Sequence, residues 1–232
     1  MSYRDFKLLT FDVVGTLIDF ERGVLESIRR ISGRSEADLD DDTIFEAYKR
    51  GRDAHYERSS EVMGLVYLHL ARELGLRADD AAADEFQMAV LRWPAFADSV
   101  DALRRLRRRF RLVAMTNADR SAFSFYSQTL GNPFHDSVTA DEAGCAKPNP
   151  RFFDFNRGRQ SAHGYRQDEI LHVAQSQHHD IGVARQLGYK VCWIERRQGI
   201  AGFGGTPAVA TITRPDFHFA TLAALADAVE AE

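Results

Sequence analysis

Short apolar runs alternate along the chain with longer segments whose apolar residues recur at helical spacing. The runs have the length of a buried strand and end in polar or glycine-containing turns; they are Phe6–Phe11, Arg111–Met115, Ile170–Ala174 and Tyr189–Ile194. The helical segments that follow include Ser121–Leu130, Pro150–Ser161 and Asp180–Leu187. This alternation predicts an α/β fold with a Rossmann-like parallel sheet between two helical layers. Ligands of such sheets bind beyond the carboxyl ends of the strands.

One stretch, residues 20–94, interrupts the alternation because it contains no convincing strand. Its segments Thr43–Tyr56 and Val62–Leu74 show helical spacing instead. We therefore predict a helical cap domain of residues 20–94, inserted into a core domain of residues 1–19 and 95–232. Near the C-terminus, the sequence predicts a long loop, a short strand and a closing helix at Gly199–Thr213, Phe217–Phe219 and Leu222–Val229.

Composition excludes several classes of protein. Lys plus Arg total 30 and Asp plus Glu total 34, and the net charge of −4 argues against general nucleic-acid binding. Apolar residues recur at helical spacing around the basic run Arg104–Arg109, which is typical of a solvated helix face. The two cysteines fit neither a disulfide scaffold nor a metal site. Without a membrane-spanning stretch or a secretory signal, we expect a cytoplasmic protein that binds neither membrane nor nucleic acid.

Polar residues lie at the ends of the predicted strands. Asp12 follows the first strand, and burial of a carboxylate there is energetically unfavourable unless a group of opposite charge pairs with it. Lys147 lies in a proline-stiffened segment, and Asp180 falls at a helix start after the fourth run, so the two could form an ion pair. Thr116 and Asn117 could bind an anion at a strand-to-helix turn. Helix capping or a surface position would explain each of these residues taken alone. Their order along the chain, each at a strand end or a helix start, is stronger evidence for a functional site than any one of them.

This order of motifs resembles the haloacid dehalogenase (HAD) superfamily along essentially the whole chain. Phe11–Leu17 is similar to its first motif, Thr116–Asn117 to its second, Lys147–Pro148 to its third and His172–Asp180 to its fourth. The helical insertion after the first motif is similar to the superfamily's cap of the first type. The resemblance implies a HAD-type parallel sheet core with an inserted helical cap domain.

Two positions distinguish the chain from the phosphatases of that superfamily. Phosphatases carry a second Asp two residues after the nucleophile, which protonates the leaving alcohol, and here that position is Val14. They also carry an acidic magnesium ligand in the fourth motif, where this chain has Gln175. A halide leaves without a proton donor. The chain is thus most similar to the 2-haloacid dehalogenase branch, which implies hydrolysis of short 2-haloalkanoic acids without a cofactor or metal.

The resemblance also implies a catalytic role for each matching residue. Asp12 would displace halide to form an aspartyl ester, and Lys147 would keep Asp12 ionised. Asp180 would balance Lys147 and position the water that attacks the ester. The oxyanion would be held by backbone N–H groups near Thr16 and Thr116 and by the side chain of Asn117.

The substrate-binding set implied by the resemblance comprises Thr116, Asn117, Val14, Ser176, Gln177 and a cap arginine. Arg50 is the best match for that arginine by its distance from Tyr56, and Arg52 competes with it. The branch usually has Tyr at Val14, Ser at Thr116, Asn at Gln177 and Tyr at Phe153. The absent phenols change the pocket, so the halogen and the chain length are not predicted. His178 and His179, adjacent on a helix, do not predict a zinc site.

Three alternatives stay open. A HAD-type phosphatase would require Mg²⁺. A phosphonate hydrolase would need an imine-forming cap lysine, for which Lys49 is the only candidate in residues 20–94. A silent carboxylate-binding member would retain the fold without turnover, although a buried charged trio would then have little use. The branch often dimerises, and the aromatic segment Phe123–Tyr126 could serve a homodimer or simply pack in the core.

Overall fold

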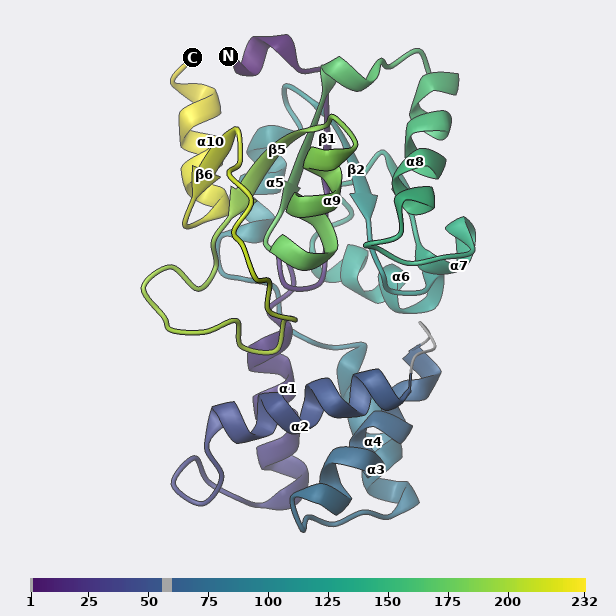
Figure 1. The fold of residues 1–232 in the computed structure, drawn as a ribbon, viewed down its shortest axis with the longest axis vertical. Coiled ribbons are helices and arrows are strands. Elements are labelled where there is room, and N and C mark those ends of the chain that lie inside the picture. The colour runs from purple at the N-terminus through teal and green to yellow at the C-terminus, as the bar shows by residue number, and fades with distance from the viewer. Residues whose placement is uncertain (1, 56–59) are drawn as a thin grey trace.

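The computed structural model describes residues 2–55 and 60–232 (Figure 1). It contains a parallel sheet in the order β3-β2-β1-β4-β5-β6. The prediction of an α/β fold is confirmed. The helices of the sheet region are α5 to α10. The strands are β1 (Leu8–Phe11), β2 (Arg111–Met115), β3 (Asp136–Val138), β4 (Ile170–Ala174), β5 (Lys190–Ile194) and β6 (Phe217–Phe219).

Alternate strand residues point to opposite faces and build two apolar cores. Leu9 and Leu112 belong to the core that includes residues of α5 (Ser99–Leu106), α6 (Arg120–Thr129) and α10 (Leu222–Glu230). Leu8 and Val113 belong to the other core, with residues of α8 (Pro150–Ala162) and α9 (Gly182–Gln186). The sheet is therefore buried on both sides, as its nearly continuous apolar strands predict.

The stretch between β1 and α5 is helical. It forms α1 (Phe20–Ser32), α2 (Asp41–Ala54), α3 (Met63–Glu73) and α4 (Asp80–Val90), which pack on one another at one end of the molecule (Figure 1). Aspartates at positions 19, 40 and 79 accept backbone N–H bonds and fix three of the starts. Tyr56, the predicted end of the segment Thr43–Tyr56, lies outside the described residues.

Two connecting segments join these helices to the sheet region and run side by side. Ile18 and Ala95 form an isolated antiparallel bridge, and the N–H of Asp19 donates to the carbonyl of Pro94 at 2.7 Å. The division into a core and a cap at these residues stays a prediction. Within the described ranges, no helix combines the length and apolar character needed to cross a membrane.

Two details differ from the expected elements. The predicted helix at Asp180–Leu187 begins instead as a π-helical turn, Gln177–Ile181, because Ser176 caps it by accepting the N–H of His179, and α9 follows. β3 was not predicted; it has three residues, of which Asp136 and Ser137 are polar and only partly buried. The predicted C-terminal loop is present between β5 and β6, and we call residues 195–216 the strap.

Candidate active site

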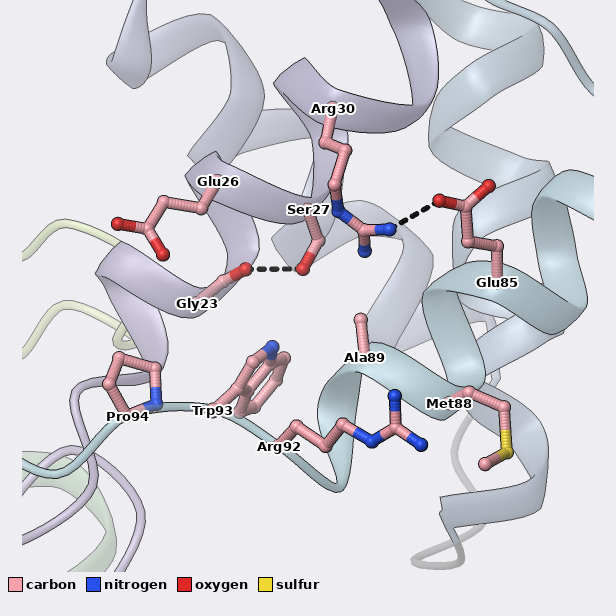
Figure 2. Close-up of a pocket in the computed structure, with 10 residues that line it drawn as sticks. All are labelled: Gly23, Glu26, Ser27, Arg30, Glu85, Met88, Ala89, Arg92, Trp93 and Pro94. Carbon is pink, nitrogen blue, oxygen red and sulfur yellow. Dashed lines mark hydrogen bonds and ion pairs between the residues drawn. The ribbon is translucent and has the colours of Figure 1, made fainter.

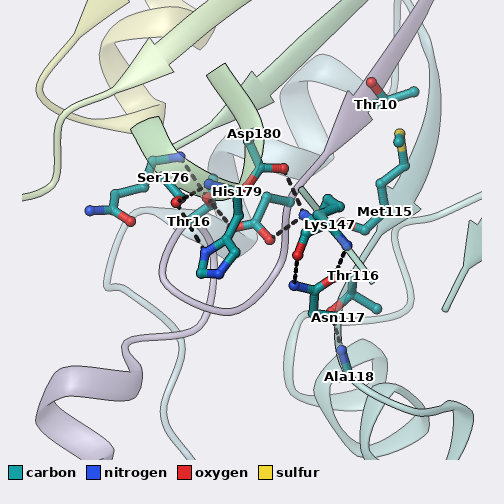
Figure 3. Close-up of polar contacts among 12 residues, drawn as sticks. Thr10, Thr16, Met115, Thr116, Asn117, Ala118, Lys147, Ser176, His179 and Asp180 are labelled. Atoms are coloured by element: carbon teal, nitrogen blue, oxygen red, sulfur yellow. Dashed lines mark hydrogen bonds and ion pairs between the residues drawn. The ribbon is translucent and has the colours of Figure 1, made fainter. Parts of the chain in front are cut away.

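A fully buried lysine lies at the centre of the polar cluster beyond β1 and β4. The Lys147 Nζ donates to Asp180 Oδ1 at 2.7 Å (Figure 3). It also donates to Asp12 Oδ1 at 2.8 Å and to the carbonyl of Met115 at 2.7 Å. Its side chain is only 1% exposed. All three ammonium protons thus have acceptors, and the three residues predicted to act together are in contact.

The neighbouring turns hold these groups in place. The Asn117 amide clamps the Lys147 main chain, donating to its carbonyl at 2.9 Å and accepting its N–H at 2.7 Å. The Thr16 hydroxyl donates to Asp12 Oδ2 at 2.6 Å and accepts the N–H of Gln175 at 2.8 Å. Gly15 adopts a φ of 97° in the turn, a conformation that favours glycine.

The charges of the cluster shift the pKa values in different directions. Burial raises the pKa of Asp12, and the charge of Asp180 adds to this, while Lys147 opposes it. Burial also opposes ionisation of Asp180, but Lys147 and a hydrogen bond from His172 outweigh it and lower the pKa of Asp180 to about 2. The pKa of Lys147 is raised because the two carboxylates outweigh its burial. Asp180 is therefore an ionised acceptor at neutral pH.

A cavity of about 690 Å³ opens between the helices α1 and α2 and the strand ends. Both Asp12 and Asp180 line it, which makes it the candidate catalytic cavity. Residues 205–207 of the strap form part of its wall and were not predicted as site residues. Other lining residues are Val14, Phe20, Glu46, Tyr48, Lys49, Arg50, Arg52, Asp53, Asn117, Pro148, Gln175, Ser176, His178 and His179.

Four predicted residues are not among those that line the cavity, and one of them is the fully buried Lys147. Thr16 lies behind Asp12 and bonds to it. Thr116 is fully buried, its N–H donates to the carbonyl of Val138 at 3.0 Å, and its hydroxyl accepts the N–H of Ala118 at 3.1 Å. The Gln177 amide is turned to the strap, where it accepts the N–H of Thr213 at 2.9 Å. Direct substrate contact is accordingly not proposed for Thr116 or Gln177.

The two cap arginines differ in their partners. Arg50 is half exposed; it forms an ion pair with Glu73 through two guanidinium nitrogens and lies 3.9 Å from Glu46. Arg52 is partly buried and donates to the sulfur of Met63 at 3.1 Å. No carboxylate among residues 2–55 and 60–232 lies within ion-pair distance of Arg52. Among the described residues, Arg52 is thus a cavity-lining arginine without an ion-pair partner.

The donor set around Asp12 does not fit a divalent cation. Both oxygens of Asp12 already accept bonds, from Lys147 and Thr16, and the third position is the amide of Gln175. In the part of the chain that the structure describes, no three His, Cys, Asp or Glu residues are grouped to hold a metal ion. Magnesium prefers anionic oxygen ligands, and the one carboxylate oxygen of the Asp12–Lys147–Asp180 cluster that has no hydrogen-bond partner among the described residues is Oδ2 of Asp180.

A second cavity, of about 320 Å³, lies between α1 and α4 (Figure 2). Its two acidic residues form ion pairs, Glu26 with Arg22 and Glu85 with Arg30, and its Ser27 hydroxyl donates to the carbonyl of Gly23. The two carboxylates and the Ser27 hydroxyl of this cavity thus already have partners in neighbouring residues. The chemistry of the molecule is concentrated in the larger cavity.

A parallel sheet with an Asp–Lys–Asp cluster at its strand ends and a helical insertion after β1 is the architecture of a HAD-type hydrolase. The sequence profile of the haloacid dehalogenase-like hydrolases matches residues 6–188, and the chain belongs to this family. Haloacetate dehalogenase H-2 of Moraxella sp. (strain B) is 24% identical over 200 residues, which cover 83% of this chain and 87% of that protein. An (S)-2-haloacid dehalogenase of Pseudomonas fluorescens is 27% identical over 155 residues, 64% of each chain.

Solved structures share the fold. The L-2-haloacid dehalogenase from Xanthobacter autotrophicus superimposes with a TM-score of 0.71 and 20% identity, over 97% of this chain and 98% of that one. The HAD-hydrolase YfnB from Bacillus subtilis, bound to magnesium, superimposes with a TM-score of 0.74 and 20% identity, over the same shares. The fold is therefore common to a dehalogenase and to a magnesium-bound relative, and the residues of the site must decide between the two chemistries.

Proposed function

We propose that the chain is a hydrolytic dehalogenase that converts short 2-haloalkanoic acids and water into 2-hydroxy acids and halide. The observation that carries the proposal is the Asp12 carboxylate, which is held by Lys147 and Thr16 and has Val14 where a phosphatase needs a proton donor. The named dehalogenases among the relatives support it. One structure of the Xanthobacter enzyme carries covalently bound chloropropionic acid, consistent with an ester intermediate.

The reaction would proceed in two half-reactions. A carboxylate oxygen of Asp12 attacks C2 of the substrate, and the carbon–halogen bond breaks as the ester C–O bond forms, so halide leaves with the bonding electron pair. Water then attacks the carbonyl carbon of the ester and gives its proton to Asp180. The second N–H of the Asn117 amide, beyond the one bound to Lys147, is suited to stabilise the oxyanion. Collapse of the tetrahedral intermediate breaks the bond between the Asp12 carbonyl carbon and the substrate oxygen, and that oxygen takes the proton from Asp180 as the 2-hydroxy acid leaves. The carboxyl of Asp12 then loses the second proton of the attacking water to solvent, which restores both carboxylates.

We assign substrate-carboxylate or halide binding to Arg52 rather than to Arg50. Arg52 lies one helical turn after Tyr48, on the side of α2 that faces the cavity. Its guanidinium can bind an anion without breaking an ion pair to any residue that the structure describes, whereas Arg50 would have to leave Glu73. The sequence spacing alone favoured Arg50.

The test is halide release from fluoro-, chloro- and bromoacetate and from both 2-chloropropionate enantiomers, each with and without EDTA. We expect release that EDTA does not change, incorporation of heavy oxygen from labelled water into Asp12 in a single turnover, and loss of turnover in Asp12→Asn. Magnesium-dependent release of phosphate from a phosphate ester, without halide release, would establish the phosphatase alternative. Thermal stabilisation by a haloacid without either product would indicate a silent binder.

A further inference from the structure

A histidine is buried inside the sheet, directly beneath the Asp–Lys–Asp cluster. His172, in β4, is 0% exposed and lies opposite Thr10 of β1 in the parallel register. Its Nδ1 is 2.9 Å from the Thr10 hydroxyl, and its Nε2 is 3.0 Å from Asp180 Oδ1. The mechanism proposed above leaves this imidazole without a role.

The partners of the imidazole assign its protons. An ionised carboxylate can only accept hydrogen bonds, so the Nε2 of His172 is protonated and donates a hydrogen bond to Asp180. The Thr10 hydroxyl can then donate to Nδ1 and hold that tautomer. Both ring nitrogens are satisfied, and the ring makes an edge contact with Phe153 at a centroid distance of 5.5 Å. The imidazole is therefore fixed in orientation as well as in position.

Two donors meet on one oxygen of Asp180. Oδ1 accepts from both Lys147 and His172, whereas Oδ2 has no hydrogen-bond partner among the described residues although the side chain is 1% exposed. Rotation of the carboxylate would break both bonds to Oδ1. Asp180 is among the residues that line the candidate catalytic cavity, and the fixed orientation leaves the buried Oδ2 as its one oxygen without a partner among the described residues.

The need for a second donor follows from the chemistry of Asp12. Once Asp12 is an ester, it carries no negative charge. Lys147 then has only one carboxylate partner, Asp180, instead of two. The bond from His172 does not depend on the state of Asp12. We propose that His172 is a positioning residue for ester hydrolysis, which keeps Asp180 oriented with Oδ2 toward the attacking water after the halide has left. The proposal rests on the function proposed above.

The experiment separates the two half-reactions. His172→Phe keeps a ring against Phe153 and removes both hydrogen bonds, and His172→Gln restores a side-chain N–H donor. In rapid-quench assays with chloroacetate, we expect His172→Phe to give a halide burst within about threefold of the wild-type rate. Its steady-state turnover should fall about 10- to 100-fold, the loss expected for one hydrogen bond to a buried charge. The ester should accumulate in intact-protein mass spectra, and His172→Gln should recover at least about fivefold.

Each other outcome identifies what fails. If the burst and the turnover of His172→Phe fall together, or if neither changes, His172 is only a packing residue. If His172→Phe does not fold, the isosteric Thr10→Val decides: a full burst with slowed turnover supports the proposal, and unchanged turnover overturns it. If the wild-type protein releases no halide and forms no ester, the proposed function itself is wrong, and the role of His172 falls with it.

Discussion

Two carboxylates and one ammonium are buried together at the candidate site, so their charges do not balance. Lys147 donates to both Asp12 and Asp180, and its third proton binds a neutral carbonyl. An anionic substrate approaching this cluster meets a net negative charge, which is unfavourable in a low-dielectric cavity. A cation on the opposite wall must therefore offset that repulsion. Arg52, which has no ion-pair partner among the described residues, can supply that cation.

We predict a large loss of activity on substitution of Arg52 and a small change on substitution of Arg50. Arg52→Met should lower kcat/KM for a 2-haloacid by about 100-fold or more, because a charge-assisted hydrogen bond in a cavity is lost. Arg50→Met removes a half-exposed ion pair with Glu73 and should change kcat/KM by less than about threefold. Steady-state halide release measures both variants. A large effect of Arg50→Met with a small effect of Arg52→Met would reverse the assignment.

At the residue scale, the sequence could predict the central trio but not the orientation of its neighbours. Asp12, Lys147 and Asp180 were predicted because strand ends in a parallel sheet converge on one edge. The spacing on α2 could not show which arginine already has a partner, since Glu73 comes from another helix. His172 was overlooked because it falls within a strand, although a polar residue in an apolar run was a signal that could have found it.

At the scale of elements, a tryptophan determines how α1 packs against the chain that leaves α4. The Trp93 ring lies against the backbone of Gly23, and a Cβ at Gly23 would lie 2.2 Å from the Trp93 Cδ1 (Figure 2). Glycine in a helix interior is normally unfavourable relative to alanine. Glycine is needed at position 23 because the Trp93 ring leaves no room for a Cβ there.

Gly23→Ala and Gly158→Ala should change stability in opposite directions. Gly158 lies in the exposed face of α8, and a Cβ there would meet nothing within 4 Å. We expect Gly158→Ala to raise the free energy of unfolding by about 1 kcal/mol through helix propensity. Gly23→Ala should lower it by at least about 2 kcal/mol because the Trp93 ring must move. Urea denaturation measures both, and stabilisation by Gly23→Ala would contradict this account of the packing.

Strands with a continuous apolar run were predictable from the sequence, while β3 and the position of the strap, which depend on tertiary contacts, were not. The strands at Arg111–Met115 and Ile170–Ala174 agree with the prediction to the residue. β3 is held by pairing with β2 rather than by its own apolar pattern, so its sequence carries little signal. The strap was predicted as a loop, but its place at the cavity depends on Glu21 of α1, which bonds to Arg197 at 2.6 Å and to the N–H of Gly205 at 2.9 Å.

For the whole molecule, the same cluster links the chemistry of the site to folding stability. Asp180 has a pKa of about 2 in the folded protein against an ordinary 3.8. A lowered carboxyl pKa contributes stability above the ordinary value, and that contribution is lost as the pH falls from about 4 to about 2. Asp12 has the opposite sign, because its raised pKa means that ionisation in the folded protein costs stability at neutral pH.

Neutral variants of the two carboxylates should therefore differ in sign. At pH 7, Asp180→Asn should lower the free energy of unfolding by about 2 kcal/mol relative to the wild type, and this deficit should shrink as the pH falls toward 2. Asp12→Asn should raise it at pH 7, and the gain should vanish below the ordinary pKa of an Asp carboxyl, where the wild-type Asp12 is protonated too. Urea denaturation at several pH values tests both variants. If Asp12→Asn were the less stable protein at pH 7, the attraction of Lys147 would outweigh burial, and the Asp12 carboxylate would stabilise the folded protein instead of destabilising it.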